Sequence, residues 1–439
     1  MKPTAQVVAP KGFDSARGTP QAVRGMNDVL PDEAPLWERF EDTARAVFAQ
    51  YGYRNMRVPI VEPTALFVRG IGEFTDVVER EMYTFEDKLN GESLTLRPEA
   101  TSGIVRATLQ HNLTYDRPQR VWTSGPMFRH ERPQKGRYRQ FHQMDVEALG
   151  FAGPDVDAEQ IVMLARSWKA LGRPGIELQL NSIGDTGERA AHREQLIAYF
   201  ERHADVLDGD AKRRLQANPL RILDSKNPTM QAMIGEAPKL IDFIDGESRG
   251  HFDSLTRMLG DAGLAYVVNP RLVRGLDYYN RTVFEWVATS AELGAQGTVA
   301  GGGRYDYLFE MLGGKRNYAC GFAIGIERMI VLLAAAGAKA QAAPLAYVVH
   351  DGADAGALAR SLAERLRDAG MSIVVNAGGG SMKSQMKRAD ASAARYALII
   401  GQDEASTDTV AVKPLREGGE QFAVPALEVA RRLEQMSRG

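Results

Sequence analysis

Two stretches near the middle of the chain constrain the fold more than any other part of the sequence. "RVWTSGPMFRHE" (residues 120–131) and "RYRQFHQMDVEALG" (residues 137–150) have the residue types of β-strands, and only the basic segment "RPQKG" lies between them. Strands joined in this way pair side by side and run in opposite directions. The sequence therefore predicts an antiparallel pair with a long, basic tip.

The second of these strands has two chemically different faces, because side chains alternate along a strand. One face is mostly apolar and is expected to pack on the core: His142, Met144 and Val146. The other face presents an aromatic ring, an amide and two carboxylates: Phe141, Gln143, Asp145 and Glu147.

Length and composition bound the class of protein. A chain of 439 residues is too long for one compact core, so two or three domains are expected. The net charge of −2 gives no global basic field for nucleic acid, so RNA contacts must come from local patches. The single cysteine, Cys320, excludes an internal disulfide. No apolar run is long enough to cross a membrane and the N-terminal segment lacks a secretory core, so a cytoplasmic location is expected.

Changes of pattern along the chain predict its domains. Residues 1–20 are expected to form a flexible tail, residues 21–340 the main domain, and residues 185–259 a helical insertion within it. Asp32–Tyr51 has helical spacing, with Asp32 and Glu33 in the first turn and one apolar stripe: Leu36, Phe40, Ala44, Val47 and Phe48. From residue 344 to 439, apolar strands alternate with helices, which predicts a separate α/β domain with largely parallel strands.

Three further segments of the main domain have readable patterns. "LTLRPEATSGIVRATLQH" predicts strand, turn and helix, with the turn at Arg97–Pro98 because a residue before proline avoids the helical region. "GTVAGGGRYDYL" predicts a strand that ends in glycines. "YACGFAIGIERMIVLLAAAGA" predicts a strand, a glycine turn and a buried helix.

Cations gather at the tip of the central strand pair, where guanidinium groups would match phosphate oxygens: Arg129, Arg132, Lys135, Arg137 and Arg139. The alternative is a basic loop that only faces water. Arg328 follows Gly325 in the first turn of a predicted helix, where the helix dipole favours anions. The charge of Arg328 therefore opposes the helix dipole. A bound phosphate would offset this repulsion, or a salt bridge would, with Glu327 as the candidate partner.

The motifs of several enzyme classes are missing from the sequence. "AGGGRYD" has no Lys-Ser/Thr pair of a phosphate loop, and it does not match the dinucleotide fingerprint. There is no GxSxG, HExxH or CxxC, and the histidines lack metal-ligand spacing. "RGLDYYNRTVFEW" joins Arg274, Asp277, two tyrosines and Glu285, a cluster that could belong to a loop and core or to a site.

Taken together, these segments resemble histidyl-tRNA synthetase, a class II aminoacyl-tRNA synthetase. The resemblance covers the chain from about Val23 onward and rests on segments in the family's order: "RGMNDVLP", the first class II motif at Asp32–Pro63, "RGLDYY", "AGGGRYD", and the second and third motifs "FRHERPQKGRYRQFHQMDVEALG" and "GFAIGIERM". It implies an α+β catalytic domain on a mixed, mostly antiparallel sheet, a C-terminal anticodon-binding-like α/β domain, and a homodimer.

The resemblance also implies roles for individual residues. Those expected to bind ATP, with magnesium on the polyphosphate, are Arg129, Glu131, Arg137, Phe141 and Arg328. Those expected to form the histidine pocket are Glu99, Thr101, Gln143, Glu147, Arg274, Tyr278, Tyr279 and Tyr305. Arg274 and Arg129 are expected to stabilise charge on the α-phosphate as catalytic residues, and the tRNA acceptor end is expected to meet Arg132, Gln134 and Arg139. No metal-ligating residue is implied.

The implied reaction joins histidine to ATP as histidyl-adenylate and then to the 3′ end of tRNA(His). Three alternatives stay open at this point. A synthetase-like regulatory subunit of histidine biosynthesis would bind ligand without charging tRNA, but such proteins usually lose the catalytic arginines, and Arg129, Arg274 and Arg328 are present. A class II synthetase for another amino acid would lack "RGLDYY" and "GGGRYD". A general RNA-binding protein would carry a larger basic surface.

Overall fold

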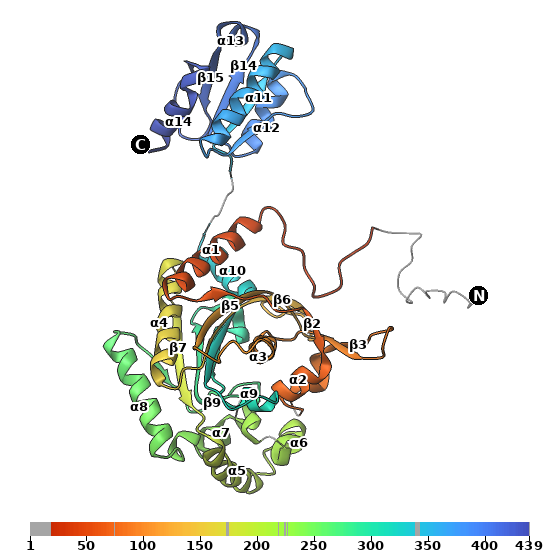
Figure 1. The fold of residues 1–439 in the computed structure, drawn as a ribbon, viewed down its shortest axis with the longest axis vertical. Coiled ribbons are helices and arrows are strands. Elements are labelled where there is room, and N and C mark those ends of the chain that lie inside the picture. Colours follow the sequence, from red (N-terminus) through yellow and green to blue (C-terminus); the bar gives the residue numbers. More distant parts are fainter. Residues whose placement is uncertain are drawn as a thin grey trace, which may run out of the picture. The chain divides into compact units, whose positions relative to one another are not determined.

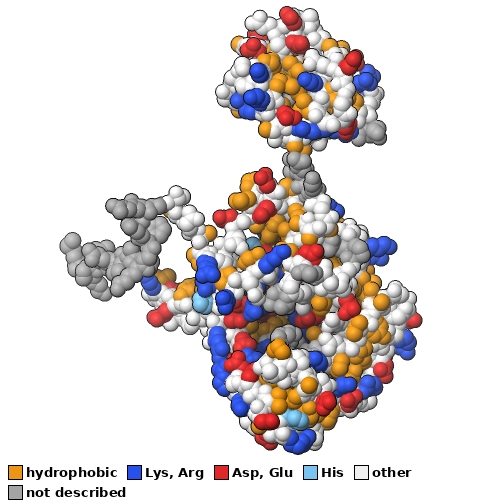
Figure 2. Space-filling model, turned by 180° about the vertical axis from the view of Figure 1, so that it is seen from behind, with side chains coloured by type: hydrophobic (Ala, Val, Ile, Leu, Met, Phe, Trp, Pro, Cys, Tyr) orange, Lys and Arg blue, Asp and Glu red, His pale blue; other side chains and the backbone are white. Residues whose placement is uncertain are grey.

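The structure is a computed structural model that describes residues 19–73, 75–172, 175–217, 219–223, 225, 227–338 and 343–438. Nearly all of the tail predicted at residues 1–20 lies outside the described residues. The chain forms two compact units, Met1–Lys339 and Ala340–Gly439 (Figure 1). On the face seen in Figure 2, basic and acidic side chains of the larger unit are interspersed, in keeping with the small net charge.

The larger unit is built on an eight-stranded sheet in the order β1-β5-β6-β11-β10-β9-β7-β8. Its strands are β1 (Arg54–Asn55), β5 (Gln119–Phe128), β6 (Gln140–Leu149), β7 (Ile176–Ser182), β8 (Val267–Val268), β9 (Asn280–Ala288), β10 (Thr298–Arg304) and β11 (Ala319–Gly325). The six central strands pair antiparallel, and β1 and β8 add parallel edges. The predicted mixed, mostly antiparallel sheet is confirmed.

The predicted antiparallel pair is β5 and β6, in register from Gln119 opposite Leu149 to Phe128 opposite Gln140. Both strands are shorter at the tip than predicted. The amide of Arg129 still donates to the carbonyl of Arg139, but the amides of Arg139 and Gln140 donate to the carbonyl of Gly25 instead of continuing the ladder. The N-terminal segment therefore ends the pairing and widens the tip, a long-range contact that local pattern does not contain.

Helices cover both sides of this sheet. On one side are α1 (Ala34–Gln50), α10 (Ile326–Ala335) and α4 (Pro154–Ala170), and in the hollow of the curved sheet lies α3 (Thr101–Gln110) (Figure 1). The predicted stripe of α1 is buried as expected: Leu36, Phe40, Ala44, Val47 and Phe48. The prediction for its first turn is wrong, because the helix begins at Ala34 and leaves Asp32 and Glu33 before it.

A small antiparallel sheet leads the chain into α3. It is formed by β2 (Val61–Pro63), β4 (Ser93–Leu96) and β3 (Tyr83–Glu86), with α2 (Thr64–Ile71) and the π-helix η1 (Val77–Glu81) between them. The predicted turn at Arg97–Pro98 is confirmed, since β4 ends at Leu96 and α3 begins at Thr101. This turn carries Glu99 to the N-terminus of α3.

Between β7 and β8 the chain is helical. The elements are α5 (Thr186–Glu201), α6 (Gly209–Ala217), η2 (Pro219–Ile222), η3 (Pro228–Met230), α7 (Gln231–Glu236), η4 (Leu240–Asp242) and α8 (Gly246–Asp261). Asp185 begins α5 with a capping box in which the side chain of Glu188 reaches back to the amide of Asp185. Leu196, Phe200 and Met230 lie in a hydrophobic core of this stretch's own.

The glycines of "AGGGRYD" lie inside β10 and do not end it, which corrects the prediction. A Cβ on Gly302 would lie 2.0 Å from the carbonyl oxygen of Gly321, and one on Gly303 would lie 2.2 Å from that of Thr282. The run thus allows β11 and β9 to approach β10 closely. The short elements η5 (Ala291–Gln296) and α9 (Leu308–Met311) flank the strand.

The smaller unit is a five-stranded sheet in the order β13-β12-β14-β15-β16 with helices packed on it. Its elements are β12 (Ala346–His350), α11 (Ala353–Asp368), β13 (Ile373–Val375), α12 (Met382–Ala391), β14 (Tyr396–Ile400), α13 (Gln402–Thr407), β15 (Thr409–Pro414), β16 (Phe422–Pro425), η6 (Ala426–Glu428) and α14 (Val429–Arg438). The three predicted strands are parallel, and β15 and β16 extend them antiparallel. Among the described residues of the whole chain, no helix has the length and apolarity to cross a membrane.

Candidate active site

The polar face of β6 lies toward the N-terminus of α3, and Glu147 joins the two. Glu147 is 1% exposed, and its Oε1 accepts a hydrogen bond of 2.8 Å from the hydroxyl of Thr101. Its Oε2 accepts a hydrogen bond from the hydroxyl of Tyr305. Burial raises the pKa of Glu147 well above the ordinary value for a glutamate. The result is an acidic group deep in the protein, held by two hydroxyl groups.

Glu99 is fixed by the first turn of α3. Its Oε2 accepts from the amide of Thr101 at 2.7 Å and its Oε1 accepts from the amide of Ser102 at 3.0 Å. These amides would otherwise lack partners at a helix N-terminus, which explains why a buried carboxylate is stable there. Glu99, Thr101 and Glu147, far apart in sequence, are brought together.

Three tyrosines form the aromatic wall beside Glu147. The ring centroid of Tyr278 lies 4.7 Å from that of Tyr279 and 5.5 Å from that of Tyr305. All three side chains are buried, and burial raises the pKa of each hydroxyl, so these groups stay neutral and can donate hydrogen bonds. The wall combines apolar rings with polar atoms, as a site for a flat, polar heterocycle requires.

Arg274 lies against this wall and is oriented by Glu285, an acid that the sequence could not assign to the core or to a site. Its guanidinium is 5.5 Å from the ring centroid of Tyr279 and forms an ion pair with Glu285 of β9. The other oxygen of Glu285 accepts from the hydroxyl of Thr298 at 2.8 Å. A Cβ on Gly301 would lie 2.6 Å from Nη1 of Arg274, so this glycine makes room for the guanidinium. "RGLDYYNRTVFEW" therefore belongs to the site.

The cations predicted for phosphate converge from different elements. The Nε of Arg129 donates to the carbonyl of Pro98 at 2.9 Å, and its guanidinium lies 5.3 Å from the ring of Phe141. Arg328, on α10, donates to the carbonyl of Gly136 at the tip of the β5–β6 pair, at 2.9 Å, and to that of Thr298. Burial, together with repulsion by Arg129 and Arg137, lowers the pKa of Arg328. Cations that repel one another in a partly buried place favour an anion.

Two of the predicted ATP-site residues pair with each other. Arg137 forms an ion pair with Glu131 and a second one of 3.5 Å with Glu81. The charge of Glu327 acts on that of Arg328. The carboxylate of Glu327 also accepts from the amide of His142 at 2.8 Å and contacts its ring Nδ1 at 2.9 Å. That contact lies on the other face of β6, away from the pocket.

The residues predicted to meet tRNA stay outside this pocket. Arg132 and Gln134 are exposed on the tip of the β5–β6 pair. Arg139 donates to the carbonyl of Glu131 at 3.1 Å within the same tip. Gln143 does lie on the same face of β6 as Glu147, and its side-chain oxygen is buried with no hydrogen-bond partner among the described residues. Asp145, between Gln143 and Glu147, also lines the pocket face, although only its strand position signalled it.

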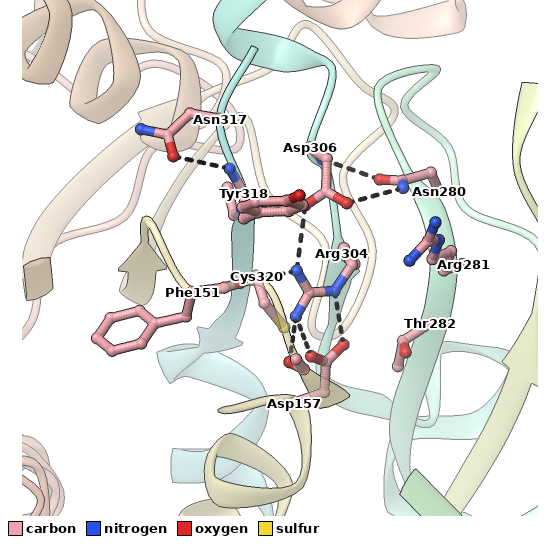
Figure 3. A network of polar contacts seen from close by, with 12 residues as sticks. Phe151, Asp157, Asn280, Arg281, Thr282, Arg304, Asp306, Asn317, Tyr318 and Cys320 are labelled. Carbon is pink, nitrogen blue, oxygen red and sulfur yellow. Dashed lines mark hydrogen bonds and ion pairs between the residues drawn. The ribbon is translucent and has the colours of Figure 1, made fainter. Parts of the chain in front are cut away.

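A buried polar network surrounds Arg304, the residue that precedes Tyr305 in the chain (Figure 3). Arg304 is 0% exposed and forms ion pairs with Asp157 of α4 and with Asp306. It also donates to the carbonyls of Phe151 and Gly153 at 3.0 and 2.7 Å. The side chain of Asn280 donates to Asp306 at 3.1 Å, which ties β9 to the end of β10. "AGGGRYD" is thus no phosphate loop: its arginine faces away from the pocket and anchors the tyrosine.

The larger unit has a curved, mostly antiparallel sheet that holds buried carboxylates beside converging arginines, and the chain carries a separate α/β unit. Together these features define a class II aminoacyl-tRNA synthetase. A family model described as histidyl-tRNA synthetase matches residues 25–329, and one described as anticodon binding domain matches residues 345–436. The chain belongs to the histidyl-tRNA synthetase family.

Individual relatives agree with this family. A histidine–tRNA ligase of Methylobacillus flagellatus is 61% identical over 402 residues, which cover 91% of this chain and 96% of that protein. One of Thiobacillus denitrificans is 61% identical over 419 residues, covering 95% and 99%. The structure resembles apo histidyl-tRNA synthetase of S. aureus, with a TM-score of 0.79 and 32% identity over 95% of this chain and all of that one.

A second solved structure bears on the alternatives. A protein of Bacillus halodurans C, titled ATP phosphoribosyltransferase regulatory subunit/histidyl-tRNA synthetase, has a TM-score of 0.63 and 20% identity over 87% of this chain and 98% of that one. At this identity the likeness concerns the fold alone. The relatives near 60% identity named above are ligases.

Proposed function

We propose that the pocket beside Glu147 binds histidine and that the neighbouring arginines bind ATP, so that one site carries the first step of histidine–tRNA ligation. The chain is a histidine–tRNA ligase: it activates histidine with ATP to histidyl-adenylate and pyrophosphate, and then transfers histidine to the 3′ end of tRNA(His). The observation that supports this assignment of the site is the junction of Glu147, Thr101 and Tyr305 with the tyrosine wall on which Arg274 lies.

The polar atoms of the pocket match the polar atoms of histidine. Glu147 and Tyr278 would bind the imidazole, since a ring with one donor and one acceptor nitrogen needs both kinds of partner. Glu99, Thr101 and Gln143 would bind the α-ammonium, and Tyr279 and Tyr305 would enclose the ring. Such a pocket rejects analogues that leave its buried polar groups unpaired.

The arginines would bind ATP and stabilise charge on its α-phosphate. Adenine would stack on Phe141, with its amino group at Glu131. Arg137 and Arg328 would hold the outer phosphates. Arg129 and Arg274 would face the α-phosphate. The histidine carboxylate attacks the α-phosphorus, the bond to the β-phosphate breaks, and pyrophosphate leaves. This step needs positioning and charge stabilisation but no protein nucleophile.

Magnesium would accompany ATP and supply charge neutralisation on the polyphosphate. Among the described residues, no group of three or more His, Cys, Asp or Glu side chains could hold a metal ion. A Mg²⁺ ion that accompanies ATP is bound largely through phosphate oxygens and needs few protein ligands. Glu285, the carboxylate beside Arg274, is the group that would add one.

Amino-acid-dependent ATP–pyrophosphate exchange, measured with magnesium and without tRNA across all twenty amino acids, tests the site assignment. Exchange with histidine alone is expected. Exchange with a different amino acid would keep the ATP residues but overturn Glu99, Gln143, Glu147 and Tyr278 as histidine selectors. No exchange from folded protein would point to a regulatory, ligand-binding protein.

We also propose that residues 344–439 bind the anticodon and that the reaction takes place in the cytoplasm, where tRNA is used. Two copies of the chain would form a homodimer through the region of α1. The support for the dimer is the first class II motif and the exposed apolar residues that precede α1 or lie at the start of β2: Val29, Leu30, Ile60 and Val61. The tip of the β5–β6 pair, with Arg132, Gln134 and Arg139, would meet the acceptor end of tRNA.

Deleting residues 344–439 is expected to leave histidine-dependent exchange within a few-fold of the full chain but to impair tRNA charging severely. The reason is that the pocket and the arginines all lie before residue 340. Exchange, aminoacylation and sedimentation of both forms would be compared. Loss of exchange from a truncated protein that is still folded and dimeric would show that the proposed division is wrong.

A further inference from the structure

Asp145 is a third carboxylate on the pocket face that has no role so far. It lies on β6 two residues from Gln143 and two from Glu147, so all three side chains leave the same face of the strand. Its strand neighbours are Thr123 on β5 and Ala323 on β11. Asp145 is 1% exposed. A carboxylate is rarely buried to this degree without a partner.

One oxygen of this carboxylate has no hydrogen-bond partner within the described part of the chain. The Oδ2 atom of Asp145 is buried and accepts no hydrogen bond there. The two cations whose charges act on Asp145 donate hydrogen bonds to carbonyl groups: Arg97 to those of Pro126 and Val58 at 3.0 and 3.1 Å, and Arg129 to that of Pro98. An unmade hydrogen bond at a buried polar atom is costly to folding. Since the side-chain oxygen of Gln143, on the same face, also has no partner among the described residues, the two atoms together point to a donor that arrives with a ligand.

The surroundings of Asp145 decide which kind of donor fits. The charges that act on Asp145 are those of Glu99, in the turn before α3, and of Arg97 and Arg129. Glu147, which follows Asp145 on β6, also interacts with it electrostatically. Burial and the charge of Glu99 raise the pKa of Asp145 to about 8, against the opposing effect of Arg97 and Arg129. An ionised phosphate would be repelled by Glu99 and Glu147. A cationic donor would satisfy the acidic groups together.

We propose that Asp145 accepts a hydrogen bond from the α-ammonium group of the amino-acid substrate, beside Glu99 and Gln143. The proposal rests on the proposed binding of histidine in this pocket. Two positions along a strand span roughly 7 Å, so an imidazole at Glu147 leaves the ammonium end of the same molecule near Asp145. Binding converts the neutral carboxyl of Asp145 into a carboxylate, and its proton leaves to solvent.

Calorimetric titration of the full chain with histidine, without ATP, measures both consequences. In buffers of different ionisation enthalpy at pH 7, the wild type is expected to release close to one proton more than Asp145→Asn. The variant is expected to bind histidine roughly tenfold to hundredfold more weakly, the usual effect of removing one charged partner of a hydrogen bond. Asp116→Asn, which changes an exposed aspartate, is the matched control and is expected to bind as the wild type does.

Two histidine analogues separate the ammonium from the rest of the ligand. Histidinol keeps the ammonium and the ring, and imidazolepropionate keeps the ring and the carboxylate but has no ammonium. Asp145→Asn is expected to weaken histidine and histidinol by the same factor and to leave imidazolepropionate unchanged. An equal loss for imidazolepropionate, or no loss for histidine, would overturn the proposal. Asp145→Ser provides a second variant should the amide not fold, with melting curves as the check.

The failure of this inference differs from the failure of the proposed function. If the wild type binds no histidine, the pocket assignment itself is wrong. If the wild type binds histidine and Asp145→Asn and Asp145→Ser bind it equally well, only the role of Asp145 is wrong. If the variants instead lose ATP affinity and keep histidine affinity, Asp145 orients Arg129 and does not contact the ammonium.

Discussion

Arg274→Ala is expected to slow adenylate formation at least about a hundredfold, a loss comparable to that of removing one group that stabilises transition-state charge, while histidine affinity stays within a few-fold. The guanidinium lies against the ring of Tyr279, held by Glu285, with Gly301 leaving space for it. In this position it would act on charge that develops at the α-phosphorus, a charge absent from the complex with histidine alone. Single-turnover adenylate formation and equilibrium histidine binding would be measured on the same preparations.

The control for Arg274 is an exposed arginine outside the site that also lies against a tyrosine ring. Arg316 lies 4.8 Å from the ring centroid of Tyr307 and does not line the pocket, so Arg316→Ala should leave both measurements unchanged. Comparable losses of rate and affinity in Arg274→Ala would contradict a role confined to the α-phosphate. Because the substitution leaves Glu285 without its cation, Arg274→Ala/Glu285→Gln tests whether any loss of affinity comes from that unpaired acid.

The sequence predicted those parts of the site whose geometry follows from the repeat of side chains along one helix or one strand. Alternation along residues 140–149 placed Phe141, Gln143, Asp145 and Glu147 on one face, and the helical stripe of α1 was read residue by residue. Arg328 could be placed in a first turn because a glycine precedes a periodic apolar run. In each case neighbours a few residues apart determine the geometry.

Contacts between distant segments could not be read in this way. The residues next to Arg139 in the sequence do not predict that its amide donates to the carbonyl of Gly25. In the same way, the residues next to Arg137 do not predict its ion pairs with Glu131 and Glu81. The family resemblance supplied roles for the arginines, but it did not say which groups hold them before ATP arrives. For the same reason the sequence predicted the strand face on which Asp145 lies, but not that an oxygen of its carboxylate has no hydrogen-bond partner among the described residues.

The glycines of β10 illustrate a local signal with a non-local cause. A glycine run fits a turn, a phosphate loop or close approach of another backbone equally well. Only the positions of Gly321 and Thr282 on the neighbouring strands decide among these readings. Arg304, which follows the run, was therefore unassigned from sequence, although its side chain is fully buried together with that of its partner Asp157.

Arg304→Met is expected to destabilise the larger unit by about 3–5 kcal/mol, the usual cost of removing one partner of a buried ion pair. The substitution keeps much of the side-chain volume but leaves Asp157 and Asp306 without their cation in a place that water does not reach. Denaturant unfolding measures the loss. Arg120→Met removes an arginine of the partly exposed pair with Glu159 and is expected to cost less than about 1 kcal/mol. Equal losses in the two variants would mean that the Arg304 network contributes no more than a surface pair.

The loss of stability in Arg304→Met should depend on pH if it comes from an unpaired charge, and should not if it comes from a lost packing contact. In the wild type, burial alone would raise the pKa of Asp157, but Arg304 and His251 outweigh burial and hold it below the ordinary aspartate value. The native state then binds fewer protons than the unfolded state, so this group adds stability above about pH 4 and the contribution is lost as pH falls below it. In Arg304→Met, burial is opposed by His251 alone and the pKa of Asp157 rises. The difference in unfolding free energy between wild type and variant should therefore grow as pH rises from about 4 to 6. A difference that does not change over this range would indicate that Arg304 contributes through packing and not through its charge.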